Sequence, residues 1–61
     1  YEFNLIAADI KSLANGNIST EQIIDELNRR FPEKKNIEIF RWLLDNDKLT
    51  KDDLGNITWK K

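Results

Sequence analysis

The sequence predicts a mainly α fold with a small β-hairpin, in which three helices are followed by two short strands. Three observations predict this class. Apolar residues recur every three or four positions through three successive stretches, which is the period of an amphipathic helix. A four-residue helix-start signal opens the second stretch. Near the end of the chain the apolar period changes to two, around residues typical of a tight turn.

The first helix is expected over Phe3–Ala14. Its apolar positions are spaced by three and four residues, and they are Phe3, Ile6, Ile10 and Leu13. The run Asn15-Gly16-Asn17 ends the helix, since glycine readily takes the left-handed conformation found after a helix C-terminus. Ile18 then lies alone and indicates a very short extended piece.

The second helix is expected over Thr20–Arg30. Ser19 is its N-cap, and Gln22 lies three residues later, which together match a capping box. Ile23, Leu27 and Phe31 lie four residues apart and form its apolar stripe.

The third helix is expected to begin at Pro32 or Glu33 and to end at Asn46. Proline disfavours helix for the residue before it and suits the first turn of a new helix. The core-facing arc consists of Ile37, Ile39, Phe40, Leu43 and Leu44, whereas the solvent-facing side carries Lys34, Lys35, Glu38, Arg41 and Asp45. Trp42 lies at the margin between the two sides.

The last stretch, Lys48–Lys60, is expected to form the hairpin. Leu49, Ile57 and Trp59 share one face, and Thr50, Thr58 and Lys60 share the other. Between them, Asp52-Asp53-Leu54-Gly55 matches a type I turn with aspartate first and glycine last. A two-stranded hairpin is marginal alone, so we expect its apolar face to pack on the helices.

This order of elements resembles the winged helix-turn-helix superfamily over nearly the whole chain. The resemblance rests on the capping box Ser19-Thr20-Glu21-Gln22, the short turn Phe31-Pro32-Glu33 and the closing hairpin. It implies a recognition module whose third helix, in many members, enters the major groove of DNA. We therefore expect residues 1–61 to form a single winged helix domain. Because the chain starts at Tyr1 rather than Met, we interpret it as a piece excised from a longer protein.

The composition argues against catalysis. The chain has no histidine and no cysteine, so the commonest general base and the strongest nucleophile are absent, as is any thiolate metal site. Only two glycines occur, and they form no phosphate-binding motif. We therefore expect no enzyme activity, no small-molecule substrate, no cofactor and no metal. No apolar run is long enough to span a membrane, and we expect an intracellular location in the cytoplasm, nucleoid or nucleus.

The leading functional hypothesis is binding of duplex DNA, as part of a transcription or replication factor. Arg41 has the geometry for guanine, while lysines near the third helix and on the hairpin can meet phosphates. The expected contacts are Lys34, Lys35, Asn36, Arg41, Lys51 and Lys60, with Lys61 beside them. The formal charge of the chain is only −1, and Glu38 and Asp45 lie on the same side as Arg41. A strong nonspecific grip on DNA is therefore not expected.

The alternative hypothesis is docking of a protein partner through the third helix and the hairpin. Its expected contacts are Trp42, Glu38 and Asp45, with Asp52 and Asp53 in the hairpin turn. A partly exposed tryptophan on a polar helix face is a typical interface anchor. The competing interpretation is that Trp42 folds over the first helix or the hairpin and completes the core.

Overall fold

A computed structural model describes residues 2–60 of the chain. These residues form three helices and a small three-stranded antiparallel sheet, which confirms the mainly α fold class with a β-hairpin. In chain order the elements are α1 (Glu2–Leu13), β1 (Asn15–Ser19), α2 (Thr20–Arg30), α3 (Asn36–Asp45), β2 (Leu49–Lys51) and β3 (Asn56–Trp59).

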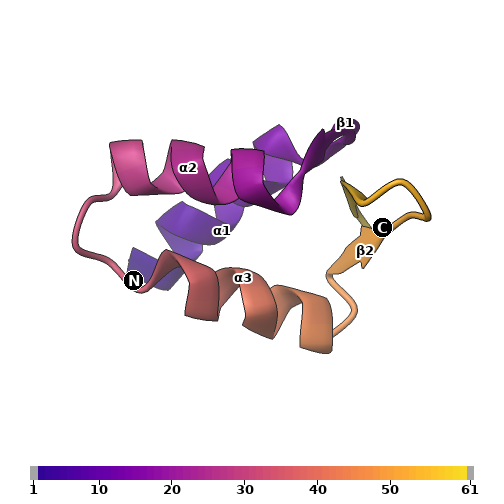
Figure 1. Cartoon of the computed structure of the whole chain (residues 1–61). Coiled ribbons are helices and arrows are strands. Elements are labelled where there is room, and N and C mark those ends of the chain that lie inside the picture. Colours follow the sequence, from indigo (N-terminus) through magenta and orange to yellow (C-terminus); the bar gives the residue numbers. More distant parts are fainter. Residues whose placement is uncertain (1, 61) are drawn as a thin grey trace.

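The helices pack on one another, and the strands close one end of the bundle. Each helix contacts both of the others. In Figure 1, α2 and α3 run along opposite edges of the molecule and α1 passes behind them. The strands lie beyond the last turn of α3, so the turn from α2 to α3 is at the opposite end from the hairpin. This arrangement leaves the outer side of α3 open to solvent.

The sheet has β3 in its centre, between β1 and β2. Strands β2 and β3 pair as the expected hairpin, with Leu49 opposite Trp59. Strand β1 is longer than the short extended piece at Ile18 that the sequence indicates. It is stabilised by pairing with β3, which lies far along the chain. The residues around Ile18 give no indication of this pairing.

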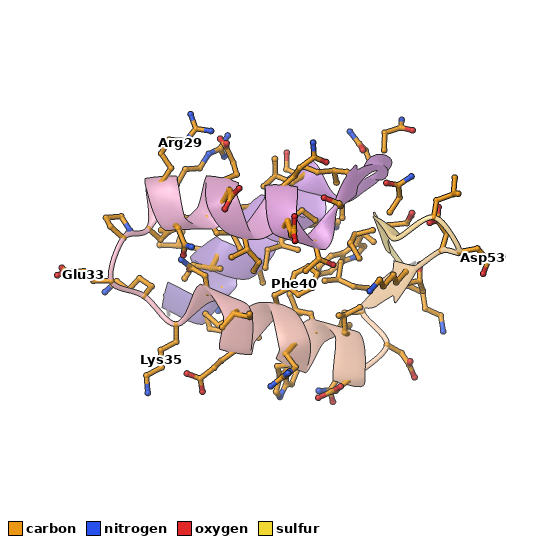
Figure 2. All side chains as sticks on the ribbon, in the orientation of Figure 1. Arg29, Glu33, Lys35, Phe40 and Asp53 are labelled. Atoms are coloured by element: carbon orange, nitrogen blue, oxygen red, sulfur yellow. The ribbon has the colours of Figure 1, made fainter. Side chains whose placement is uncertain are left out.

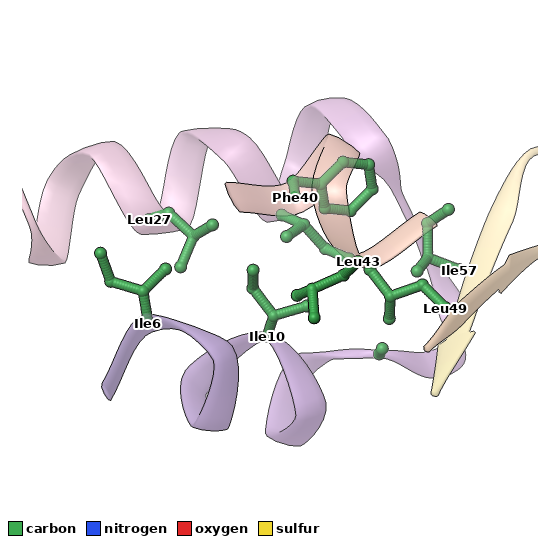
Figure 3. Close-up of a cluster of buried hydrophobic side chains, with 9 residues drawn as sticks. Ile6, Ile10, Leu27, Phe40, Leu43, Leu49 and Ile57 are labelled. Atoms are coloured by element: carbon green, nitrogen blue, oxygen red, sulfur yellow. The ribbon is translucent and has the colours of Figure 1, made fainter. Parts of the chain in front are cut away.

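Buried apolar side chains from all three helices and from the hairpin meet in the core shown in Figure 3. Leu49 and Ile57 are buried and Trp59 is half-buried, so the apolar face predicted for the hairpin is confirmed. The buried residues are Ile6, Ile10, Ala14, Ile23, Leu27, Phe40, Leu43, Leu49 and Ile57.

Ile37 is the one member of the predicted α3 core arc that the structure places at the surface, with 59% of its area exposed. The prediction was wrong at this position. The buried arc of α3 is centred on Asn36, Phe40 and Leu43, and Ile37 lies about 100° around the helix from Asn36. Ile39 and Leu44, at the two edges of the arc, are partly buried.

The start of α2 confirms the capping box. The Gln22 amide donates to the Ser19 hydroxyl at 3.3 Å, and the Ser19 amide donates to Gln22 Oε1 at 3.0 Å. These bonds satisfy amide groups that have no partner inside the helix, so α2 begins where the sequence predicts. Its last residue, Arg30, is also the predicted one.

The start of α3 differs from the prediction, because the helix begins at Asn36 and not at Pro32 or Glu33. Glu33 has a φ of 68°, which lies in the left-handed region and cannot continue a right-handed helix. The segment after α2 is therefore an irregular turn, and Lys34 and Lys35 lie in that turn and not on the helix.

The hairpin turn has the predicted form. The Gly55 amide donates to the Asp52 carbonyl at 3.0 Å, and Gly55 takes a φ of 85°. Asp52 Oδ1 accepts bonds from the amides of Leu54 and Asn56 at 2.9 and 2.8 Å. The Asp52 side chain thus stabilises the turn through hydrogen bonds to its backbone, as aspartate commonly does at the first position of tight turns.

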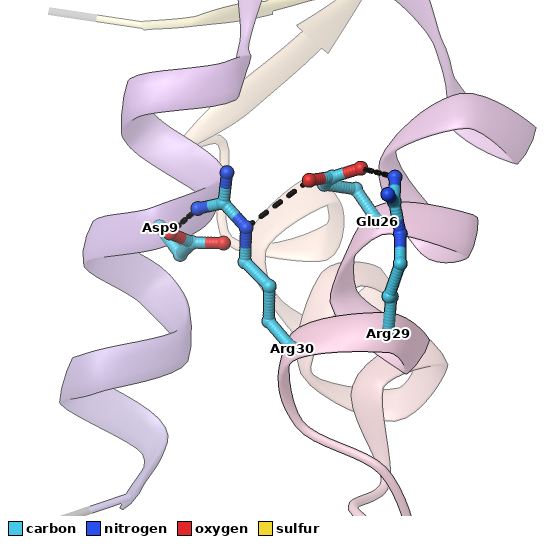
Figure 4. Close-up of polar contacts among 4 residues, drawn as sticks. All are labelled: Asp9, Glu26, Arg29 and Arg30. Atoms are coloured by element: carbon cyan, nitrogen blue, oxygen red, sulfur yellow. Dashed lines mark hydrogen bonds and ion pairs between the residues drawn. The ribbon is translucent and has the colours of Figure 1, made fainter.

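An ion-pair network joins α1 to α2 (Figure 4). Arg30, in the last turn of α2, bonds to Asp9 of α1 and to Glu26 at 3.2 Å, and Glu26 also pairs with Arg29. The nearby Asp9 carboxylate, helped by Glu26, raises the pKa of Arg30 above its ordinary value. These ion pairs tie the end of α2 to α1.

Candidate nucleic-acid interface

The junction between α2 and α3 is fixed by Asn36, which was expected to contact DNA. The structure buries this residue to 2% exposure. Its Nδ2 donates to Asn28 Oδ1 at 2.9 Å and to the Phe31 carbonyl at 3.1 Å. The Asn36 side chain therefore serves the fold, because it links α2, the turn and α3, and it is not available as a surface contact.

The outer side of α3 is exposed as predicted and carries charges of both signs. Arg41, Glu38 and Asp45 are all exposed. At the start of the helix, Lys35 Nζ lies 3.9 Å from Glu38 Oε2. Figure 2 shows Lys35 and Glu33 pointing away from the body of the protein at this end of the molecule. Among the described residues, Arg41 forms no ion pair, so its guanidinium is available to a ligand.

The hairpin carries two further lysines of the predicted set. Lys51 on β2 and Lys60 after β3 are exposed, and the Lys60 amide donates to the Lys48 carbonyl at 2.8 Å. Lys51 lies opposite Ile57, so it is separated from Lys60 along the hairpin. Lys61 lies outside the described residues. The predicted basic contacts are therefore not gathered in one patch: Lys34 and Lys35 precede α3, and Lys51 and Lys60 lie separately on the hairpin that follows it.

The acidic residues of the hairpin turn have different roles. Asp52 is engaged by the turn amides, whereas Asp53 projects at the hairpin tip in Figure 2. Leu54 beside it is 86% exposed. The tip therefore combines a carboxylate with an apolar side chain, which is a poor surface for meeting phosphate.

Trp42 is partly packed on α1 and partly exposed, so it combines features of the core residue and of the interface anchor considered from the sequence. Its ring packs edge-on against Phe3 of α1, with centroids 5.1 Å apart and planes at 89°. The residue nevertheless keeps 49% of its area exposed. It lies on a groove of about 610 Å³ between α1, the α2–α3 turn and α3. Glu38 lines the same groove, and Asp45 does not.

A second hollow, between α2 and α3, was missed in the sequence. It measures about 370 Å³ and is lined by Thr20, Glu21, Ile24, Asp25 and Ile37. The helical period could not predict this hollow, because it placed Ile37 on the core-facing side of the third helix. Sequence reasoning also missed Lys11, whose Nζ lies 5.8 Å from the centre of the Trp59 ring, since only the fold brings these residues together.

No protein-family model, curated protein or solved structure matches the chain. Among residues 2–60 no helix is long and apolar enough to cross a membrane.

Proposed function

We propose that this domain is a winged helix recognition module that binds duplex DNA through α3, as part of a transcription or replication factor. The observation that carries the proposal is the position of Arg41. It is exposed near the middle of the helix that follows the α2–α3 turn, with no ion pair to neutralise it among the described residues. A guanidinium there can donate two hydrogen bonds to the edge of a guanine.

The lysines before and after α3 suit the insertion of this helix into a DNA groove. A helix fits the major groove, and α3, with ten residues, has a length of about 15 Å. Lys34 and Lys35 precede its first residue, and Lys51 lies on the hairpin beyond its last. Lysines at both ends of an inserted helix are placed to meet the phosphates on either side of the groove.

The acidic residues of α3 limit the strength of this binding. Glu38 and Asp45 repel phosphate, and Glu38 lies within ion-pair distance of Lys35. The number of phosphates neutralised is therefore small, and the salt dependence of the affinity should be shallow. The proposal is a sequence-reading domain of modest affinity and not a general DNA-coating protein.

The test is an amide-shift NMR titration with a 15-base-pair duplex, at low and at physiological salt. We expect shifts confined to residues 34–45 and the hairpin, and smaller at higher salt. Arg41→Ala should weaken binding by about 1–3 kcal/mol, roughly 5- to 150-fold, because it removes the base contact. The combined Lys34→Ala, Lys35→Ala and Arg41→Ala variant should not bind.

The control is Arg29→Ala, which removes another exposed arginine, on α2 and not on α3. It should bind DNA like the unmodified domain. Equal losses in Arg29→Ala and Arg41→Ala would show that only overall charge matters. Unchanged affinity in the triple variant would remove this surface from consideration.

A second candidate function is docking of a basic protein segment on the same side of α3. The exposed Ile37 favours it, since its hollow is bordered by the carboxylates of Glu21 and Asp25. Neither carboxylate forms an ion pair within the described part of the chain. A segment with an aliphatic side chain between lysines would complement this hollow in shape and charge.

The same NMR experiment separates the two candidates when a peptide of sequence KKIIKK replaces the duplex. If the domain docks a basic segment, KKIIKK should shift the amide signals around Ile37, and EEIIEE should not. The Ile37→Ser variant should show no such shifts with KKIIKK. If the duplex produces shifts and KKIIKK binds no better than EEIIEE, DNA binding stands and this second candidate is wrong.

A further inference from the structure

The apolar floor of the groove beside Trp42 is a feature of the surface that neither proposed function uses. Its apolar floor comes from α1 and α3, through Phe3, Ile6, Ile39 and Trp42. Its rim comes from the α2–α3 turn and the first turn of α3, through Glu33, Lys34, Lys35 and Glu38. A half-exposed tryptophan that lines an apolar hollow of about 610 Å³ is typical of the residues that contribute most to binding at protein interfaces.

We propose that this groove binds a second copy of the chain, so that the domain forms a two-fold symmetric dimer. The first argument is shape. In a two-fold interface the same patch meets itself, so it must offer both a projection and a recess. Here about half of the Trp42 area is exposed and can be covered by a partner, and the recess that Trp42 lines with Phe3, Ile6 and Ile39 can receive the same side chain of a second copy.

The second argument is charge. The rim holds two glutamates and two lysines, so it has no net charge and attracts neither a strongly acidic nor a strongly basic segment. A two-fold rotation can place lysine of one rim against glutamate of the other, which makes the rim complementary to itself. The Lys35–Glu38 pair is highly exposed and therefore weak, so exchanging it for pairs across the interface costs little.

This inference goes beyond DNA binding and does not depend on it. Trp42 follows Arg41 directly and therefore points about 100° away from it around α3. Arg41 does not line the groove. The groove rim and the proposed DNA contacts share Lys34 and Lys35 but not Arg41, and self-association is measured with no DNA present.

The first experiment is sedimentation equilibrium of the domain over a concentration series up to about 1 mM. We expect the mass to rise from one copy to two within this range. Trp42→Ala should weaken association by about tenfold or more, since a central aromatic anchor is lost. The matched control is Leu5→Ala, which removes a similarly exposed apolar side chain of α1 that lies off the groove. It should dimerise normally.

The second experiment tests self-complementarity and does not depend on the stability of Trp42→Ala. Lys35→Glu makes the rim acidic and Glu38→Lys makes it basic, so each variant alone should associate more weakly than the unmodified domain. An equimolar mixture of the two should recover a dimer, because an acidic rim then meets a basic one. Asp45→Lys, on α3 but outside the groove, is the control for a charge change and should associate as the unmodified domain does.

Three results would overturn the proposal. They are a domain that stays monomeric throughout the series, a dimer unaffected by Trp42→Ala, and a mixture that associates no better than its components. Circular dichroism of each variant establishes that it is folded. None of these results bears on the duplex titration, so self-association and DNA binding can fail separately.

Discussion

Asn36 is a buried polar residue at the junction of two helices, where its amide bonds to both Asn28 and the Phe31 carbonyl. Buried polar groups cost free energy unless they are paired. Its Nδ2 is paired twice, whereas its Oδ1 has no hydrogen-bond partner among the described residues. The residue therefore contributes through its donor, which fixes the angle at which α3 leaves the turn.

We predict that Asn36→Ala lowers the free energy of unfolding by about 1–3 kcal/mol, because Asn28 and the Phe31 carbonyl lose their donor. Urea denaturation measures the loss. Asn28→Ala removes one bond and should cost less. Combining the two changes should cost less than the sum of their separate effects, because they share a hydrogen bond. Asn4→Ala, exposed on α1, is the control, and equal stability of Asn4→Ala and Asn36→Ala would disprove the structural role of Asn36.

At the residue scale, exposure could be predicted where helical period alone decides it. Arg41, Glu38 and Asp45 are exposed as expected for this reason. The burial of Asn36 and the exposure of Ile37 could not be predicted. Both follow from the hydrogen bonds of the Asn36 side chain and from the start of α3 at Asn36. These depend on the conformation of the α2–α3 turn, which neither Pro32 nor the spacing of apolar residues predicts.

At the scale of elements, two glycines with positive φ hold the strands in place. Gly16 in β1 and Gly55 in the hairpin turn have φ values of 88° and 85°. A Cβ on Gly55 would meet nothing within 4 Å, whereas one on Gly16 would lie 3.3 Å from Thr58 Oγ1 of β3. The two sites therefore have the same backbone strain and differ in steric contact.

We predict that Gly55→Ala destabilises the domain by about 1–2 kcal/mol, which is the cost of the left-handed conformation for a residue with a Cβ. Gly16→Ala should cost more, because Thr58 must also move. Thermal unfolding followed by circular dichroism measures both. Adding Thr58→Ala to Gly16→Ala should recover the difference, and identical melting of the two glycine variants would show that the Thr58 contact carries no energy.

Local and distant interactions explain which elements the sequence could predict. The start of α2 is as predicted because Ser19 and Gln22 cap the helix within four residues. The hairpin turn is as predicted because Asp52 and Gly55 define it locally. Strand β1 was underestimated, since its length depends on hydrogen bonds to β3, and no residue near Ile18 indicates that partner.

At the scale of the whole molecule, stability depends on a core to which the hairpin contributes. A chain of 61 residues has a total stability of only about 3–9 kcal/mol. Ile57 of β3 is fully buried together with residues of all three helices. Removing its side chain should therefore affect the whole domain and not only the hairpin.

We predict that Ile57→Ala lowers the free energy of unfolding by about 2–5 kcal/mol, which is a large share of the total. Ile57→Val should cost about 0.5–1.5 kcal/mol. Urea denaturation followed by far-ultraviolet circular dichroism measures the stability of the helices, although the substitution lies in a strand. Leu54→Ala at the exposed hairpin tip should have no effect. An unchanged urea midpoint for Ile57→Ala would show that the helices do not depend on this side chain of the hairpin.

The pairing of β1 with β3 has a consequence for the order in which the chain folds. The helices and the β2–β3 hairpin depend on neighbours in sequence, so they can form early. The contact of Asn15 with Thr58 must instead close a loop that contains α2, α3 and β2, and the entropy of that closure delays it. We therefore expect the pairing of β3 with β1 to be completed last, when the segment after α1 joins the hairpin in one sheet.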